Sequence, residues 1–375
     1  MKEMKSINDK WSKKIILDIG EDVYQKLFYS SDENIKISPH YSFNENSLIH
    51  PEKLLFPSNW NIIGDIDCNK TKDLNKEIKK LYKNDKNNLI LYNYKSHYLD
   101  ESITSLGNIF ISTNEITKQS SGATILIEPK LEKLEKLSLN DLVNEKFKIN
   151  ISSEFFKISG ANIVQEIAFT LSAAAELVDK FGNGLLEKIS FEVIQGSNYF
   201  FEIAKIQSLR VLWSIISNKY GNQIDDCIIT AKPIVKNKTI ENFNNNIIRS
   251  TSECMSGILG GCNYIKSIPY DVKFKDRNEF SERIKYNQLL IIKNETSISR
   301  VNNAVSGSYY LTYLIENLAQ KSLDLFKKII SDGGYSSSLK NGGLFSEILS
   351  NSEKVKEQYN SGEKILVGFN KYIND

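Results

Sequence analysis

Residues 146–216 read KFKINISSEFFKISGANIVQEIAFTLSAAAELVDKFGNGLLEKISFEVIQGSNYFFEIAKIQSLRVLWSII and contain one unit twice, a short β-branched run followed by a long amphipathic run. Within 147–152 apolar and polar residues alternate, which is the period of a strand, whereas Ile163, Ile167 and Leu171 recur at helical spacing. Polar residues or glycine stand at each junction between strand and helix. In barrel enzymes this junction holds the catalytic residues.

The same alternation of strand and helix continues on both sides of this stretch, about eight times in all. The best-defined strands are apolar on both faces, as a parallel sheet requires. The pattern predicts an α/β protein with a (β/α)8 TIM-type barrel. A doubly wound open sheet is the alternative, but it would usually show a glycine-rich loop after its first strand, and 66–70 has none. The expected strands are 61–65, 89–92, 108–112, 123–128, 147–152, 189–194, 226–230 and 264–267, with a weak one near Ser299, and the expected helices are 23–29, 72–81, 161–181, 199–218, 246–259, 279–292 and 309–331.

The two ends of the chain differ from this regular middle. Residues 1–56 form a polar segment interrupted by prolines, which predicts an N-terminal arm, and residues 57–375 form the barrel with a C-terminal extension. The extension has an amphipathic helix, a turn at Gly362 and an apolar run at 365–369. We expect that run to pack back on the barrel, because large apolar side chains are costly to leave in water.

Bulk composition excludes several classes of partner and compartment. Formal net charge is +2, from 48 basic and 46 acidic residues, so the charge balance indicates neither nucleic acid nor a membrane surface as partner. The first residues, 1–11, lack the apolar core of a signal peptide, and no run approaches the length of a membrane span. We therefore expect a cytoplasmic protein.

Four cysteines are scattered through apolar runs without any CxxC pair. This spacing favours reduced, buried thiols over disulfides or a metal centre, so no metal ligands are assigned. The cysteines are Cys68, Cys227, Cys254 and Cys262.

Four later segments, taken in order, resemble the barrel domain of methylmalonyl-CoA mutase. Each would be a weak signal alone, but their order and spacing together are specific. The terminal EKILVGFNKY is similar to the ending of that barrel, and the resemblance covers about residues 35–372, most strongly after Ser159. The segments are GANIVQEIAFTLSAAAE, NYFFEIAKIQSLRVLW, NNIIRSTSECMSGILGG and SGSYYLTYLIENLAQKSLDLFKKIISDGG.

Members of this family isomerise an acyl-CoA by radical chemistry. The resemblance implies that substrate threads the barrel and that a separate C-terminal domain holds adenosylcobalamin over its mouth. This chain ends at Asp375 without the D-x-H-x-x-G signature of that domain, because His40, His50 and His97 do not follow an aspartate at the required spacing. We therefore expect no cobalamin-binding domain and no cofactor bound by this chain.

The positions that carry the chemistry in catalytic members hold other residues in this sequence. A tyrosine–histidine pair shortly before the glycine matched by Gly160 is replaced by Glu154 and Phe155, and phenylalanine can neither donate a proton nor hydrogen-bond a thioester carbonyl. The family's R-T-H-S-Q-T aligns with 228–233, where Thr230 and Lys232 stand in place of histidine and glutamine. The family's Q-E-E-S likewise reads KNET at 293–296.

Some of these residues allow two interpretations. Glu154 is either a substitute acid or base, or a polar residue facing a vestigial solvated cavity, and the second is favoured. Lys232 either binds a phosphate of CoA or extends to solvent. Lys205 and Arg210 stand at helical positions where family members place basic residues, so they are candidates for substrate binding, although a solvated helix face explains them nearly as well.

Bacterial mutases of this type often pair a catalytic chain with a related small chain that has lost activity. The departures above resemble that small, non-catalytic subunit, which implies a heterodimer with a large catalytic subunit that holds the adenosylcobalamin. The alternative is a divergent catalytic acyl-CoA mutase barrel completed by a separate cobalamin-binding domain. A barrel with unrelated chemistry is a third interpretation, weakened because no histidine or cysteine sits at the later strand ends.

Overall fold

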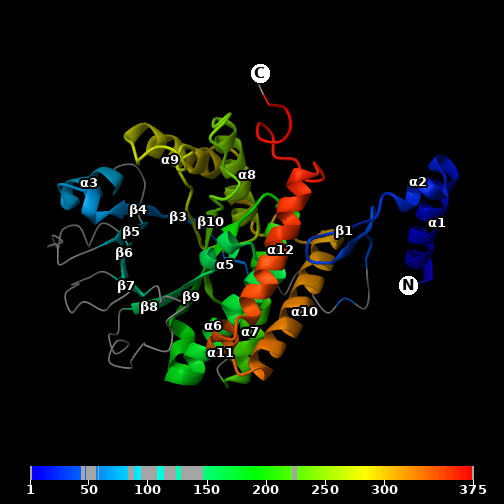
Figure 1. Ribbon diagram of the computed structural model, residues 1–375, viewed down its shortest axis with the longest axis horizontal. Coiled ribbons are helices and arrows are strands. Elements are labelled where there is room, and N and C mark those ends of the chain that lie inside the picture. The colour runs from blue at the N-terminus through cyan, green and yellow to red at the C-terminus, as the bar shows by residue number, and fades with distance from the viewer. Residues whose placement is uncertain are drawn as a thin grey trace.

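Strands and helices alternate along the computed structural model of the protein (Figure 1), which describes residues 2–43, 47, 56–57, 59–82, 88–93, 108–113, 124–127, 147–221 and 226–373. The strands are β1 Tyr29–Ser30, β2 Lys36–Ile37, β3 Asn61–Ile62, β4 Gly64–Asp67, β5 Asn88–Tyr92, β6 Asn108–Thr113, β7 Thr124–Ile127, β8 Phe147–Ser152, β9 Ile189–Gln195, β10 Ile228–Pro233 and β11 Tyr264–Ile265. The helices are α1 Lys2–Ile19, α2 Glu21–Gln25, α3 Leu74–Tyr82, α5 Glu154–Ser159, α6 Ile163–Phe181, α7 Tyr199–Lys219, α8 Asn245–Leu259, α9 Glu279–Asn294, α10 Tyr309–Ser331, α11 Tyr335–Lys340 and α12 Gly343–Asn360.

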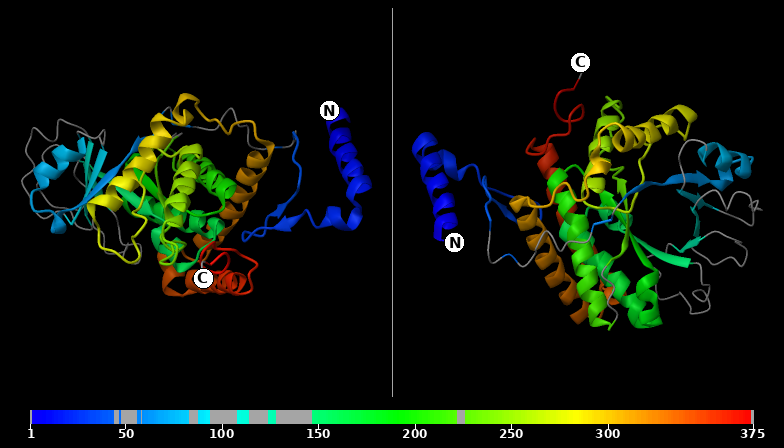
Figure 2. Two further views of the ribbon diagram at one scale, coloured as in Figure 1. Left: turned by 90° about the horizontal axis from the view of Figure 1, so that it is seen from above. Right: turned by 180° about the vertical axis from the view of Figure 1, so that it is seen from behind.

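The large sheet closes into a barrel. Its strand order is β3-β11-β10-β9-β8-β7-β6-β5-β4, and every neighbouring pair is parallel. The two outer strands, β3 and β4, are separated by Ile63 alone, whose N–H donates to Ile265 O at 3.0 Å. They are therefore two halves of one strand that pairs with β11 on one side and β5 on the other. The predicted eight-stranded parallel barrel is confirmed, and the open doubly wound sheet is excluded (Figure 2).

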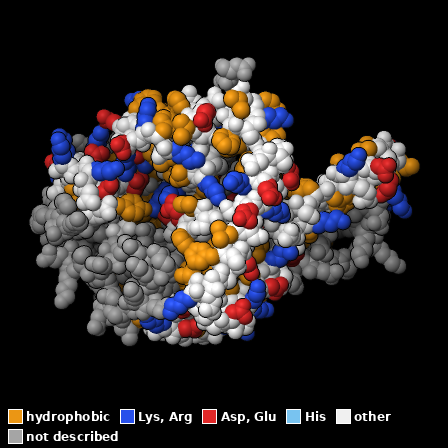
Figure 3. Space-filling view, in the orientation of Figure 1, with side chains coloured by type: hydrophobic (Ala, Val, Ile, Leu, Met, Phe, Trp, Pro, Cys, Tyr) orange, Lys and Arg blue, Asp and Glu red, His pale blue; other side chains and the backbone are white. Residues whose placement is uncertain are grey.

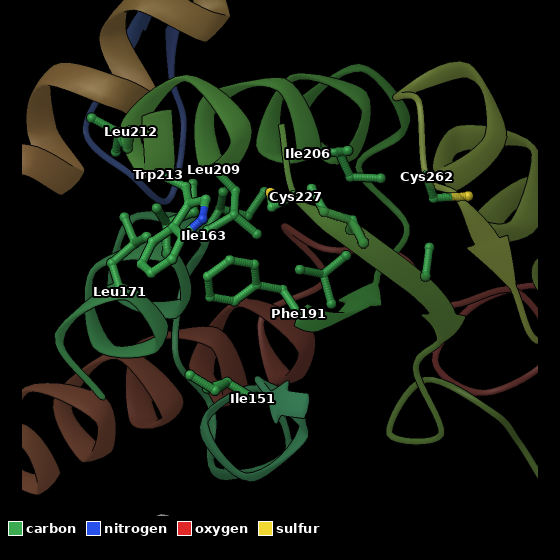
Figure 4. Packing of buried hydrophobic residues seen from close by; sticks show 14 of the residues in the cluster. Ile151, Ile163, Leu171, Phe191, Ile206, Leu209, Leu212, Trp213, Cys227 and Cys262 are labelled. Atoms are coloured by element: carbon green, nitrogen blue, oxygen red, sulfur yellow. The ribbon is translucent and has the colours of Figure 1, made fainter. Parts of the chain in front are cut away.

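The two central βα units pack the main core on the outer side of the barrel (Figure 4). Helix α6 begins at a capping box, in which Asn162 Oδ1 accepts from Gln165 N at 2.9 Å and Gln165 Oε1 accepts from Asn162 N at 3.0 Å. Nearly all of α6 is buried, because the sheet covers one side and α7 and α10 cover the other. Phe191 of β9 meets Trp213 of α7 edge to face, with ring centroids 5.1 Å apart.

The N-terminal arm is anchored by its short β1–β2 hairpin and extends away from the barrel at α1 and α2 (Figures 1 and 2). Ile35 and Ile37 are buried against the body, and Tyr313 donates its hydroxyl to Lys36 O at 2.8 Å. Helix is predicted only over 23–29, whereas α1 and α2 together cover most of 2–25. The polar composition of 2–11 conceals that longer helix.

Four local expectations are corrected by the structure. The strand expected near Ser299 is a 3-10 turn at Ile298–Arg300, which follows Ser297 in the left-handed region with φ 59°. Strand β10 continues to Pro233, three residues beyond the predicted end. Helix α5, at Glu154–Ser159, is absent from the predicted helices. The apolar tail is tied by its backbone, since Arg249 donates to Val367 O at 2.5 Å, but Ile365, Val367 and Phe369 are 48%, 46% and 55% exposed.

Within the described part of the chain, no helix combines the length and the apolar character needed to cross a bilayer.

Candidate functional site

The carboxyl ends of β8 and β10 bring two of the sequence-predicted residues together. Glu154 is the first residue of α5, shortly after β8, and Lys232 is the next-to-last residue of β10. Glu154 Oε1 lies 2.7 Å from Lys232 Nζ, and the two side chains are 35% and 22% exposed. The pair spans the mouth of the barrel between the two strands. Neither side chain is a free acid, base or phosphate ligand in this arrangement.

Phe155 and Thr230, the other two replaced positions, face different surroundings. The Phe155 ring packs edge to face against Phe156 and against Phe345 of α12, at centroid distances of 5.6 and 5.9 Å. It belongs to an aromatic contact between α5 and α12. Thr230 is 8% exposed and lines the interior of the barrel. The register of β10 places Thr230 inside the barrel, because 228, 230 and 232 alternate with the outward-facing Ile229 and Ala231.

The barrel axis is filled by side chains. Seven of the eight strands contribute to the lining of an interior cavity of only about 30 Å³, roughly the space of one water molecule. This lining mixes large apolar side chains with polar ones. The residues are Ile63, Ile90, Phe110, Lys148, Asn150, Ser190, Ile228, Thr230, Tyr264 and, directly after β11, Lys266.

A buried ion pair closes the axis nearer the carboxyl ends of the strands. Lys266 Nζ contacts Glu192 Oε2 and also donates to Tyr92 Oη at 3.0 Å, and Ser152 Oγ donates to Glu192 Oε1 at 3.0 Å. Burial alone would raise the pKa of Glu192, but the charges of Lys266 and Lys232 outweigh burial and lower that pKa to about 2. Glu192 is therefore ionised at neutral pH.

Glu192 and Lys266 are absent from the sequence-predicted site. One signal in the sequence could have found Glu192, because it is a charged residue in the run ISFEVIQ, whose other residues are apolar or uncharged. A charge in a buried parallel strand requires a partner. The identity of that partner depends on the register between β9, β10 and β11, which the sequence pattern does not reveal.

Lys205 lies beneath the barrel mouth within a buried cluster of charges. Its Nζ is 3.1 Å from Glu166 Oε2, contacts Glu202 Oε2 and donates to Ile194 O, and its side chain is fully buried. Burial would raise the pKa of Glu166, but Lys205 and Lys157 outweigh it and lower that pKa. The expectation of a solvated helix face is wrong for Lys205, and its contacts are those of an internal brace.

Arg210 is buried one turn and a half further along α7. Its guanidinium donates to Cys227 O at 2.7 Å, to Gly261 O at 2.8 Å and to Asn263 Oδ1 at 3.2 Å, and it also pairs with Asp226. These acceptors stand before β10 and before β11, on the side where the strands begin. Arg210 is therefore neither solvated nor directed to the barrel mouth, and it ties two loops to α7.

The cysteine thiols and the imidazole of His40 do not lie at the barrel mouth. All four cysteines are free and buried, and burial raises the pKa of Cys227 to about 11 and that of Cys262 to about 12. His40, the one histidine within the described residues, stacks on Trp11 of the arm with ring centroids 4.7 Å apart. His50 and His97 lie outside the described residues.

Within the described ranges, no group of three or more histidine, cysteine or carboxylate side chains is placed to hold a metal ion.

Comparison with known proteins gives one consistent result. The family model for methylmalonyl-CoA mutase matches residues 140–375, so the matched region begins later than residue 35, where the resemblance is expected to start. A methylmalonyl-CoA mutase small subunit from Porphyromonas gingivalis is 30% identical over 238 residues, which is 60% of this chain and 38% of that protein. A methylmalonyl-CoA mutase from Cereibacter sphaeroides is 30% identical over 237 residues, which is 60% of this chain and 33% of that protein.

A methylmalonyl-CoA mutase large subunit, also from Porphyromonas gingivalis, is 26% identical over 234 residues, which is 60% of this chain and 33% of that protein. The chain thus spans about a third of the length of the relatives it matches. The match extends from before β8 to the end of the chain and includes Glu154, Phe155, Thr230 and Lys232. The chain belongs to the methylmalonyl-CoA mutase family.

Proposed function

We propose that this chain is the small, non-catalytic subunit of an adenosylcobalamin-dependent methylmalonyl-CoA mutase. In this proposal a large catalytic subunit holds the cofactor and interconverts succinyl-CoA and methylmalonyl-CoA. The present chain forms a heterodimer with it and stabilises it.

The filled barrel axis is the observation that carries the proposal. A substrate that threads a barrel needs an open axial channel, and the pantetheine arm of CoA is a long chain. In this barrel the interior cavity holds about 30 Å³ and the Glu192–Lys266 pair stands across the axis above it. Opening a channel would separate a buried ion pair, which is strongly unfavourable. Side chains fill the space that a catalytic member leaves for its substrate.

The names of the relatives support the same assignment. One of them is a mutase small subunit, and a large subunit is known from the same organism. These names support a paired organisation, and the present chain is 30% identical to the small subunit and 26% identical to the large one.

The N-terminal arm is the segment that we assign to the contact with the large subunit. Its α1 and α2 extend away from the barrel, and they carry exposed apolar side chains that include Leu17, which is 81% exposed, and Val23, which is 46% exposed. Large apolar side chains gathered on a projecting helix are typical of an interaction surface.

Co-expression with a methylmalonyl-CoA mutase large subunit tests the proposal. We expect a one-to-one complex in size-exclusion chromatography with light scattering, and mutase turnover with adenosylcobalamin that depends on the large chain. Leu17→Asp should weaken the complex without lowering the melting temperature of the isolated chain. Ile248→Asp, at a residue of α8 that is 71% exposed, is the matched control and should leave the complex intact.

Two results would contradict the proposal. One is mutase turnover by this chain when it is mixed only with a separately produced cobalamin-binding domain, since that would make it the catalytic barrel. The other is failure of the two chains to associate at micromolar concentration.

A further inference from the structure

A second, much larger cavity lies beside the barrel mouth and outside the axis. We call it the lateral cavity, and it measures about 700 Å³. Its walls come from the loops after β9 and β10, the start of α6, one side of α12, the tail at 364–369 and the arm residues Asp32 and Glu33. A volume of this size is typical of sites for small organic ligands. The role of a mutase small subunit does not account for it.

The charged groups deep in the lateral cavity are satisfied within the protein. Lys157 Nζ lies 3.2 Å from Glu166 Oε2 and 3.6 Å from Glu202 Oε1, and the Lys157 side chain is only 11% exposed. Glu33 is buried, and burial raises its pKa, which favours its neutral form. The floor of the cavity therefore does not require a charged group from a ligand.

Accessible apolar side chains line the lateral cavity above its floor. Val355 of α12 and Leu366 of the tail are half-buried, whereas Ile240, after β10, and Phe369 of the tail are each 55% exposed. These side chains come from three segments that are distant in the sequence. Their contact with water is unfavourable, so an apolar group that covers them is stabilised in the cavity.

Three exposed lysines line the opening of the lateral cavity. They are Lys236 after β10, Lys273 between β11 and α9, and Lys356 of α12. Lys273 donates to the carbonyl oxygen of Lys236 at 3.0 Å, so these two residues share one edge. Within the described part of the chain, no ion pair joins any of the three to a carboxylate. Figure 3 shows Lys and Arg side chains gathered on this face, between α8 and the upper part of α12.

Two of these lysines lie close to other positive charges. Burial and the charge of Lys157 lower the pKa of Lys236. Burial and the charge of Arg249 lower the pKa of Lys273, although Glu241, the one exposed acid in the described lining, acts in the opposite direction. An anionic group at the opening would stabilise the ammonium forms, because a nearby opposite charge favours the charged state.

The lateral cavity is built on ordered elements. The loop after β10 is held by Lys238, which is fully buried, donates to Ile234 O at 2.8 Å and pairs with Glu253 at 2.7 Å. Asn246 of α8 accepts from Thr239 N at 2.9 Å and donates to Thr239 O at 2.8 Å. This loop is therefore fixed before any ligand enters, which lowers the entropic cost of binding.

We propose that the lateral cavity binds a small amphipathic anion, with its apolar chain against Val355 and Leu366 and its carboxylate or phosphate head among the three lysines of the opening. A cation would place its charge beside these lysines, and an uncharged apolar molecule would leave them without a counter-charge. Binding is noncovalent and does not depend on the role of the chain as a mutase subunit.

Titration of the full chain with octanoate and with octyl phosphate tests this assignment. We expect saturable one-to-one binding of at least one of them by calorimetry or by NMR, and the tighter of the two identifies the head group. Octylamine has the same chain with the opposite charge and should bind at least tenfold more weakly. Acetate lacks the chain and should show no saturable binding. Added salt should weaken the binding of the anions, because the lysines are exposed.

Reversal of charge at the opening should reverse this preference. In the double variant Lys236→Glu with Lys273→Glu, we expect the anions to bind about tenfold more weakly and octylamine to bind more tightly, because attraction becomes repulsion at two positions. Both residues are exposed, so the melting temperature should not change. The matched control is Lys13→Glu with Lys327→Glu, at exposed residues outside the lining, which makes the same change in net charge and should leave all affinities unchanged.

A variant of the wall tests the position of the chain. Val355→Trp fills part of the cavity from a half-buried position and should abolish saturable binding of the anions without lowering the melting temperature. Octylamine that binds as tightly as both anions, equal affinities of the wild type and the charge-reversed variant, or no saturable binding of either anion would each overturn the proposal. None of these measurements needs the large mutase subunit, so failure of the two chains to associate would not affect this result.

Discussion

Glu154 Oε1 and Lys232 Nζ lie 2.7 Å apart at the barrel mouth, so a residue that follows β8 and a residue of β10 bind each other. An acid after β8 and a base in β10 form a pair that satisfies both charges without a ligand. Beneath this pair, Glu192 and Lys266 form a second ion pair deeper in the barrel.

Restoring the family residues at the mouth should not restore activity. In the double variant Glu154→Tyr with Phe155→His, we expect no acyl-CoA turnover with adenosylcobalamin and no saturable binding of methylmalonyl-CoA, because the axis below remains filled. A catalytic large chain in the same assay is the positive control. Measurable turnover by the double variant would mean that the filled axis does not limit access.

The Glu192–Lys266 pair should be costly to break from one side. Lys266→Met leaves an ionised carboxylate buried without its partner, and we expect it to lower the free energy of unfolding in urea by about 3–5 kcal/mol. The double variant Glu192→Met with Lys266→Met removes both charges and should recover a large part of that loss. If the losses measured for Lys266→Met alone and for Glu192→Met alone add up in the double variant, the pair does not interact.

Stability should fall with acid in a window set by Glu192. Its pKa is lowered from the ordinary 4.5 to about 2, so the carboxylate stabilises the fold above about pH 4.5 and loses this contribution as the pH falls toward 2. The contribution is on the order of 3 kcal/mol. Unfolding by urea between pH 5 and pH 2 should show a shallower pH dependence in Glu192→Gln than in the wild type. Equal slopes would rule out this role for Glu192.

Gly196 should be required for stability, because it has no side chain to crowd Glu202. A Cβ at this position would meet Glu202 Oε1 at 2.8 Å, so in Gly196→Ala the Glu202 carboxylate must shift within its charge cluster. We expect a loss of about 1–3 kcal/mol in the free energy of unfolding. Gly184→Ala is the matched control, because a Cβ there meets nothing within 4 Å. A comparable loss in both variants would indicate a general cost of replacing glycine rather than a contact with Glu202.

Local periodicity is sufficient to predict the barrel. It places the strands 147–152 and 189–194 and the helices that follow them to within two residues, because burial in a βα unit imposes a period of about two on strands and 3.6 on helices. The same reasoning misses α5, whose six residues follow β8 closely, and misplaces a strand near Ser299. Short elements carry too few periods to be recognised, and their conformation depends on their neighbours.

The replaced residues Glu154, Phe155 and Lys232 are visible in the chain, and so is the family that the ordered segments indicate. The contacts that these residues make depend on closure of the barrel. It brings Glu154 to Lys232 across 78 positions of sequence and Glu192 to Lys266 across 74. It also buries Lys205 and Arg210, which the helical pattern places equally well on a solvated face. Such pairings depend on strand register and helix rotation, which follow from packing over the whole molecule. The local periodicity of the sequence therefore does not predict them.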